Sequence, residues 1–82
     1  MATVFTSERR YRVAVYSNDH PPAHVHAVGK GLDARFKLNC PQGPVGLWDF
    51  AGPWRLQDLN ELGEEIAARL EACCAKWSEI HG

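Results

Sequence analysis

The stretch that decides the fold is PWRLQDLNELGEEIAARLEACCAKWSEI, residues 53–80. Its apolar residues recur every three or four positions and form a stripe about 120° wide at roughly 100° per residue, which is the period of an amphipathic α-helix. Gly52 is suited to the N-cap and Pro53 to the first helical position. The sequence therefore predicts one long helix over residues 53–80. The stripe consists of Leu56, Leu59, Leu62, Ile66, Leu70, Cys73, Cys74, Trp77 and Ile80.

The residues before this helix read as strands, because apolar and polar side chains alternate with period two. The alternation predicts strands over residues 11–17, 24–28 and 32–38, and a weaker strand at a sheet edge over residues 45–48. Gly29-Lys30-Gly31, between the second and third strands, is typical of a tight hairpin. The prediction is an α+β fold, in which a three- to four-stranded antiparallel sheet precedes one long C-terminal helix packed on one face.

Length and composition indicate one small folded domain over residues 1–82, since 82 residues cannot supply two hydrophobic cores. No apolar run approaches the roughly 20 residues that cross a bilayer. Charged residues from Glu8 to Arg10 follow only a few apolar positions, so a signal peptide is not expected either. The expectation is a cytoplasmic protein that does not contact the membrane.

The three cysteines support the same compartment. Their number is odd, and the helical neighbours Cys73 and Cys74 point about 100° apart, so they cannot bridge each other. No CxxC motif indicates a zinc knuckle or a thioredoxin-like site. We expect small, mostly buried thiols without a function of their own.

The net charge of −1 hides an asymmetry along the chain. Residues 1–50 carry six Lys or Arg and four acidic residues, whereas residues 51–82 carry three basic and six acidic residues. The chain is no polycation, but its basic half is compatible both with a polyanionic partner and with an ordinary solvated surface.

The alternation assigns the strand residues to two faces of the sheet. Those expected to face the helix are Val13, Val15, Val25, Ala27, Leu32, Ala34, Phe36 and Leu38. The opposite face would then present Arg12, Tyr16, His24, His26, Asp33, Arg35 and Lys37. Such a face is either a solvated surface or a binding surface.

Three of the four histidines fall within residues 20–26. His24 and His26 are two residues apart on a strand, so their side chains point to the same side and their Cα atoms lie about 6.5 Å apart. This spacing allows two imidazoles to share one ion. His20 can supply a third ligand by folding back across two prolines, and Asp19 a fourth or an orienting group. The candidate cofactor is a divalent transition metal. The same sequence pattern is also consistent with structural histidines that pack against the Pro21-Pro22 loop.

A second chemical interpretation needs no metal. His24 and His26 are candidate catalytic residues because imidazole transfers protons near neutral pH. Arg12, Arg35 and Lys37 are candidates for binding a phosphate or nucleic acid and for stabilising developing charge. Together they would make a metal-independent ribonuclease, while the histidine cluster with a metal would make a hydrolase.

The remaining aromatic residues are expected to be structural. Trp77 lies in the helical stripe, and Trp48 and Trp54 flank the connection between the last strand and the helix, where they are expected to close the core. His81 lies near the end of the chain and is expected to be solvated.

The run Tyr16-Ser17-Asn18-Asp19-His20-Pro21-Pro22-Ala23-His24-Val25-His26, followed by a Gly turn, an alternating strand and a terminal helix with a late Trp, resembles a known family. The resemblance is to the small bacterial proteins catalogued as domain of unknown function four-one-six-zero, and it covers nearly the whole chain. Ala23 departs from the residues frequent at that spacer. The resemblance implies one component of a two-gene, toxin–antitoxin-like module, a small protein partner encoded nearby and an RNA-directed activity.

The predicted function is that of a small cytosolic bacterial interaction protein whose functional surface is the sheet face with the histidines and basic residues. One alternative is an enzyme, either a metal-dependent hydrolase or a metal-free ribonuclease. Another is a structural domain whose open sheet face or edge strand forms a homodimer.

Overall fold

The computed structural model describes all 82 residues, and its regular elements are five strands followed by two helices. The strands are β1 (Ala2–Thr6), β2 (Arg12–Val15), β3 (His24–Gly29), β4 (Leu32–Lys37) and β5 (Gly46–Ala51). The helices are α1 (Leu56–Ala68) and α2 (Leu70–His81). The α+β class is confirmed, but the sheet has more strands than predicted, and two helices replace the single one.

The strands form one antiparallel sheet in chain order from β1 to β5, so each strand pairs with its neighbours in the sequence. Gly29 pairs with Leu32 across a two-residue turn, in which Lys30 has φ 54° and Gly31 has φ 76°. Positive φ at both positions is the signature of a type I′ hairpin, so the predicted hairpin is confirmed. β5 forms one edge of the sheet, as the prediction for the last strand required.

β1 is missing from the sequence prediction. It pairs with β2 from Ala2 opposite Val15 to Thr6 opposite Arg12. Residues 2–6 include two Thr, a Val and a Phe, which are types that favour strands. This signal is short, and the sequence analysis considers the segment only as a candidate targeting sequence.

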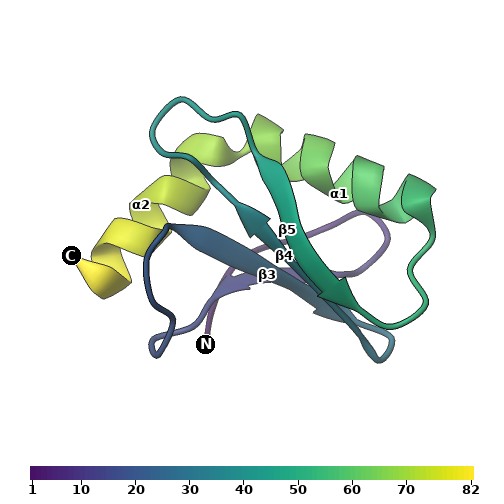
Figure 1. The fold of residues 1–82 in the computed structure, drawn as a ribbon. Helices are drawn as coiled ribbons and strands as arrows, with labels where there is room; N and C mark the ends of the chain where they lie inside the picture. The colour runs from purple at the N-terminus through teal and green to yellow at the C-terminus, as the bar shows by residue number, and fades with distance from the viewer.

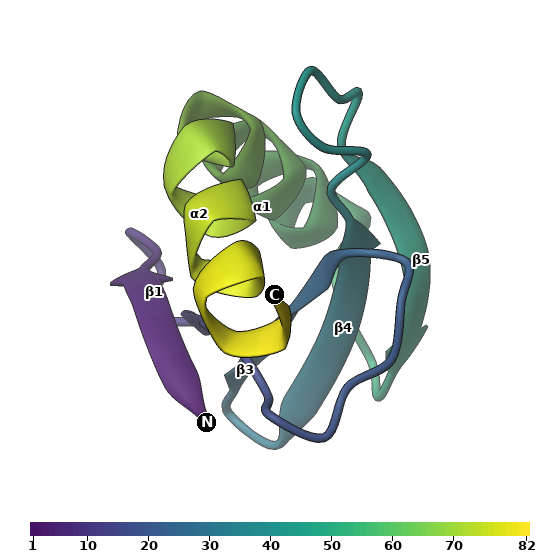
Figure 2. The same ribbon diagram turned by 90° about the vertical axis from the view of Figure 1, so that its left-hand side faces the viewer.

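Both helices pack on the same face of the sheet, which curves around them (Figures 1 and 2). Of the residues predicted to face the helix, all are buried except Leu32, which is partly buried beside them. Phe36 is the largest of these and is 2% exposed. Burying a side chain of this kind contributes about 1.5–3 kcal/mol. The helices complete the core with Leu59, Leu62, Ile66 and Cys73.

The prediction of one helix over residues 53–80 is wrong at its start and in its middle. Trp54 donates a hydrogen bond from Nε1 to the Asp33 carbonyl at 3.0 Å, and this contact holds the connection against the sheet until α1 begins at Leu56. Arg69 has φ −119° and ψ 27°, outside the helical region, and separates α1 from α2. The break turns α2 away from the axis of α1, so that its C-terminal end lies beside the start of β3 (Figure 1).

A disulfide joins Cys40 to Cys74, which corrects the expectation of three free thiols. The expectation compared only the neighbours Cys73 and Cys74, whereas the partner of Cys74 lies 34 positions earlier, in the loop after β4. Cys73 alone is free, and it is buried. The odd cysteine count therefore says nothing about compartment. Separately, neither helix has the length and apolar character needed to span a membrane.

Candidate functional site

Three side chains named by the sequence analysis meet at one end of the sheet. His24 begins β3 and His26 follows two residues later on the same face, while Asp19 reaches them from the loop before β3. His24 Nε2 lies 3.4 Å from Asp19 Oδ2, and His26 Nε2 lies 3.1 Å from Asp19 Oδ1. One ligand atom from each residue lies within 4.8 Å of the others. We call Asp19, His24 and His26 the triad.

The triad is more enclosed than an open sheet face. The side chain of His24 is 3% exposed, and those of His26 and Asp19 are each 12% exposed. Trp77 on α2 approaches His24 with ring centroids 5.2 Å apart, and Trp48 on β5 contacts the same imidazole edge-on at 5.0 Å. The predicted common direction of the two histidines is correct. Of the two alternatives for this face, a solvated surface or a binding surface, full solvation does not hold at this end of the sheet.

Hydrogen bonds fix the orientation of the groups in the triad. His24 Nδ1 lies 2.8 Å from the Pro22 carbonyl, which can only accept, so this nitrogen carries the proton. The Tyr16 backbone N–H donates to Asp19 Oδ2 at 3.2 Å. Burial raises the pKa of Asp19, but hydrogen bonds from His26 and from this N–H outweigh burial and bring the pKa below its usual value. Asp19 is therefore a carboxylate at neutral pH.

His26 stacks on an aromatic ring and lies between two carboxylates. Tyr16 stacks on it with centroids 4.2 Å apart and planes 3° from parallel. Its Nδ1 faces Asp33 Oδ1 at 3.7 Å, while its Nε2 faces Asp19. Both histidines thus direct Nε2 toward the carboxylate of Asp19 and Nδ1 toward another oxygen.

His20, the other predicted metal ligand, lies outside the triad. It is exposed in the loop, and it is absent from the group of side chains whose ligand atoms converge. Asp19, predicted as a fourth ligand or an orienting group, takes the third position instead.

The three basic candidates do not converge into one phosphate site. Arg35 forms a bidentate pair with Asp49 on β5, whose Oδ1 accepts from Nε at 2.7 Å. Hydrogen bonding by Arg35 lowers the pKa of Asp49, so this carboxylate also neutralises the guanidinium at pH 7. Lys37 Nζ lies 4.9 Å from the centroid of the Trp48 ring. Arg12 is exposed on β2, separated from Arg35 by β3.

A family model described as a domain of unknown function, DUF4160, matches residues 11–78. The chain belongs to this family. The DUF4160 match covers β2 to β5, α1 and most of α2, and therefore includes the triad, but it leaves out β1. The comparison with curated proteins and the comparison with solved structures found no match to this chain.

The DUF4160 domain also carries a surface that the sequence analysis missed. Trp48, expected in the core, is 36% exposed on β5 and has the Arg35 guanidinium 4.4 Å from its ring centroid. A register shift between β4 and β5 places Leu47 opposite Phe36 and Asp49 opposite Arg35, so Trp48 is the extra residue of a bulge. Nothing in the alternation of residues 45–48 signals that bulge. Leu47 and Phe50 are also exposed, by 44% and 54%.

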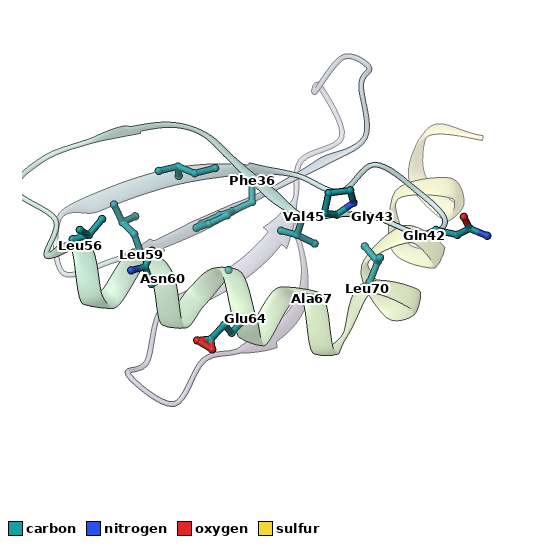
Figure 3. Close-up of a pocket in the computed structure, with 13 residues that line it drawn as sticks. Phe36, Gln42, Gly43, Val45, Leu56, Leu59, Asn60, Glu64, Ala67 and Leu70 are labelled. Atoms are coloured by element: carbon teal, nitrogen blue, oxygen red, sulfur yellow. The ribbon is translucent and has the colours of Figure 1, made fainter.

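A hollow of about 480 Å³ lies between β5 and α1, beside this exposed strand. Figure 3 shows Phe36 on the sheet and Leu59 on α1 pointing into it from opposite sides. Leu56, which is 71% exposed, lies at one end, and the loop that follows Cys40 supplies Gly43 and Val45. The hollow is mainly apolar and has the size of pockets that bind small ligands or inserted side chains.

Proposed function

We propose that this chain is a small interaction protein that binds a protein partner along β5. We further propose that it is one component of a bacterial, toxin–antitoxin-like two-gene module, as the family resemblance implies, and that this module acts in the cytoplasm. The observation that carries the proposal is the exposure of large apolar side chains on an edge strand.

β5 pairs only with β4, so the backbone groups on its outer side have no strand partner. Natural proteins commonly protect such edges with charge, bulges or a covering element, because an open edge invites pairing with another chain. β5 has such a bulge at Trp48, but the edge still presents Leu47, Trp48 and Phe50, each at least 36% exposed. This combination is typical of a strand that another protein extends or covers.

The basic residues fit this protein interface better than they fit an RNA site. Trp and Arg dominate the energetic centres of protein interfaces, and here Arg35 lies over Trp48. An RNA site needs several unpaired cations, because affinity grows with the number of phosphates neutralised. Arg35 is already paired with Asp49, and the net charge of the chain is −1.

The direct test measures binding to the product of the adjacent gene. Phe50→Lys should raise Kd at least about 10-fold, because it places a charge in the centre of the contact. The matched control is Ala75→Lys, which adds the same charge at an exposed position of α2. Equal affinity of Phe50→Lys and wild type, with both folded by circular dichroism, would remove β5 from the interface.

Two further measurements separate the alternative functions. A solution mass that doubles with concentration, and returns to the monomer value in Phe50→Lys, would indicate a homodimer through the same edge. Cleavage of RNA by the pure protein, lost in His26→Ala, would place the enzyme alternative ahead of the interaction protein. No cleavage, together with binding of the neighbouring gene product, is the result we expect.

A further inference from the structure

We propose that Asp19, His24 and His26 bind one divalent transition metal ion, through the Asp19 carboxylate and the two Nε2 atoms. This inference is independent of the β5 surface. It rests on the convergence of the three ligand groups, on the hydrogen bonds behind them, and on a buried nitrogen that has no other partner.

The spacing of the triad suits a small ion. Zinc–nitrogen bonds of about 2.0–2.1 Å and zinc–oxygen bonds of about 2.0–2.2 Å place neighbouring ligand atoms of a tetrahedron roughly 3.4 Å apart. The two nitrogen-to-oxygen distances in the triad are 3.4 Å and 3.1 Å. These distances run to the two different oxygens of Asp19, and one ligand atom from each of the three residues lies within 4.8 Å of the others. A bound ion would take the place of the hydrogen bond between His26 Nε2 and Asp19 Oδ1.

The buried Nε2 atom of His24 indicates that the triad requires a cation. Nδ1 of this ring donates to the Pro22 carbonyl, so in the neutral imidazole Nε2 carries a lone pair. That nitrogen is buried and has no hydrogen-bond partner, yet it faces the Asp19 carboxylate. Two acceptors that face each other in a buried site repel unless a cation lies between them, and a buried polar atom without a partner costs about 1–3 kcal/mol.

The surroundings orient the ligands as they are oriented in metal sites. Metal-binding histidines usually donate their second N–H to a carbonyl or carboxylate, which fixes the ring and leaves the other nitrogen free for the ion. His24 does so with Pro22. Nδ1 of His26 has no hydrogen-bond partner and lies 3.7 Å from Asp33 Oδ1, and this ring is oriented instead by stacking on Tyr16. Tyr16 holds the carboxylate of Asp19 through its N–H. The loop and β3 therefore present the ligands in a fixed arrangement before an ion arrives.

The donor set points to a class of metal. Two imidazoles and one carboxylate suit Zn²⁺, Fe²⁺ and neighbouring first-row ions, whereas Ca²⁺ and Mg²⁺ prefer oxygen ligands. Three protein ligands leave at least one coordination position for water or another small ligand. The His26 and Asp19 side chains are each 12% exposed, so the triad is not fully enclosed.

The test titrates tag-free, full-length protein with Zn²⁺ by calorimetry and follows the histidine ring nitrogens by NMR. Wild type should bind one equivalent and shift the His24 and His26 resonances, but not those of His20. Asp19→Asn should weaken binding at least about 100-fold, more than the loss of an orienting neighbour costs. His20→Ala, in the same loop but outside the triad, is the matched control and should bind like wild type.

Three results would overturn the proposal. The first is folded wild type that binds no Zn²⁺, Co²⁺ or Fe²⁺ up to about 1 mM, a limit weaker than any specific site would show. The second is an equal loss of affinity in His20→Ala, which would indicate adventitious binding by surface histidines. The third is binding without change at His24 and His26, which is read on wild type and so does not depend on the folding of any variant.

Discussion

Reduction of the Cys40–Cys74 disulfide should lower the free energy of unfolding by about 3 kcal/mol. The bond ties the loop after β4, which lines the hollow beside β5, to α2. Its two cysteines are 34 positions apart, so the bond closes a loop that includes β5, α1 and the first turn of α2. Breaking it releases this loop in the unfolded chain.

The magnitude follows from the size of that loop. The chain-entropy relation for a closed loop of this size gives roughly 3.8 kcal/mol at 25 °C, and measured values for disulfides are typically 2–4 kcal/mol. For a domain of this length, each kcal/mol corresponds to about 4–8 °C in the melting temperature. The oxidised protein should therefore melt at least about 10 °C above the reduced protein.

The assay compares urea unfolding of the same wild-type chain with and without a reductant, and mass spectrometry confirms the state of the bond. The urea concentration at the unfolding midpoint should fall on reduction. The double variant Cys40→Ser/Cys74→Ser should have the midpoint of the reduced protein, and the reductant should not change it. Equal midpoints in both states would refute the argument that this bond closes a large loop of the native fold. Weaker partner binding by the reduced protein would additionally support the β5 surface, because the released loop lies beside it.

Three further predictions concern the core, a turn and the free thiol. Phe36→Ala should lower the free energy of unfolding in urea by about 3–5 kcal/mol, because it leaves a cavity between sheet and helix. Gly52→Ala should lower the free energy of unfolding by about 1–3 kcal/mol, because Gly52 has φ +97° and an added Cβ would lie 2.6 Å from Leu32 Cδ2. Gly46→Ala is the control, because a Cβ at that position meets no atom within 4 Å. Burial raises the pKa of Cys73 to about 11, so on raising the pH the thiol loses its proton in the unfolded chain before it does so in the folded protein. The free energy of unfolding should therefore fall between about pH 8.5 and pH 11, and it should fall more in wild type than in Cys73→Ala.

Local periodicity explains which parts of the fold the sequence predicts correctly. Val25 and Phe36 each lie between two polar neighbours, and that signal alone assigns their strands and their common buried face. The hairpin is equally local, because Lys30 and Gly31 provide the two positive φ angles. Each of these features depends only on residues close together in the chain.

The features that the sequence does not predict depend on distant residues. Arg69 is neither Gly nor Pro, so no local signal marks the break between the helices, although it lets α2 reach the start of β3. The burial of His24 follows from that break, because Trp77 covers it from α2. The Cys40–Cys74 pairing likewise joins a loop to a helix that periodicity treats separately. The cluster of histidines in the sequence identifies the candidate site, but only tertiary contacts distinguish a buried triad from a solvated face.

Trp48 connects the two proposed sites, because one edge contacts His24 while its ring lies under Arg35 and Lys37 on the β5 surface. A substitution at Trp48 therefore perturbs both sites and identifies neither. Phe50→Lys should leave Zn²⁺ affinity within about 2-fold of wild type if the sites are independent, as expected for side chains without shared contacts. If a bound partner shifts Trp48 against His24, metal and partner affinities must change each other by the same factor, since coupling between two binding equilibria is reciprocal. Measuring Zn²⁺ affinity with and without the partner distinguishes these cases, and either result leaves the separate evidence for the triad and for β5 intact.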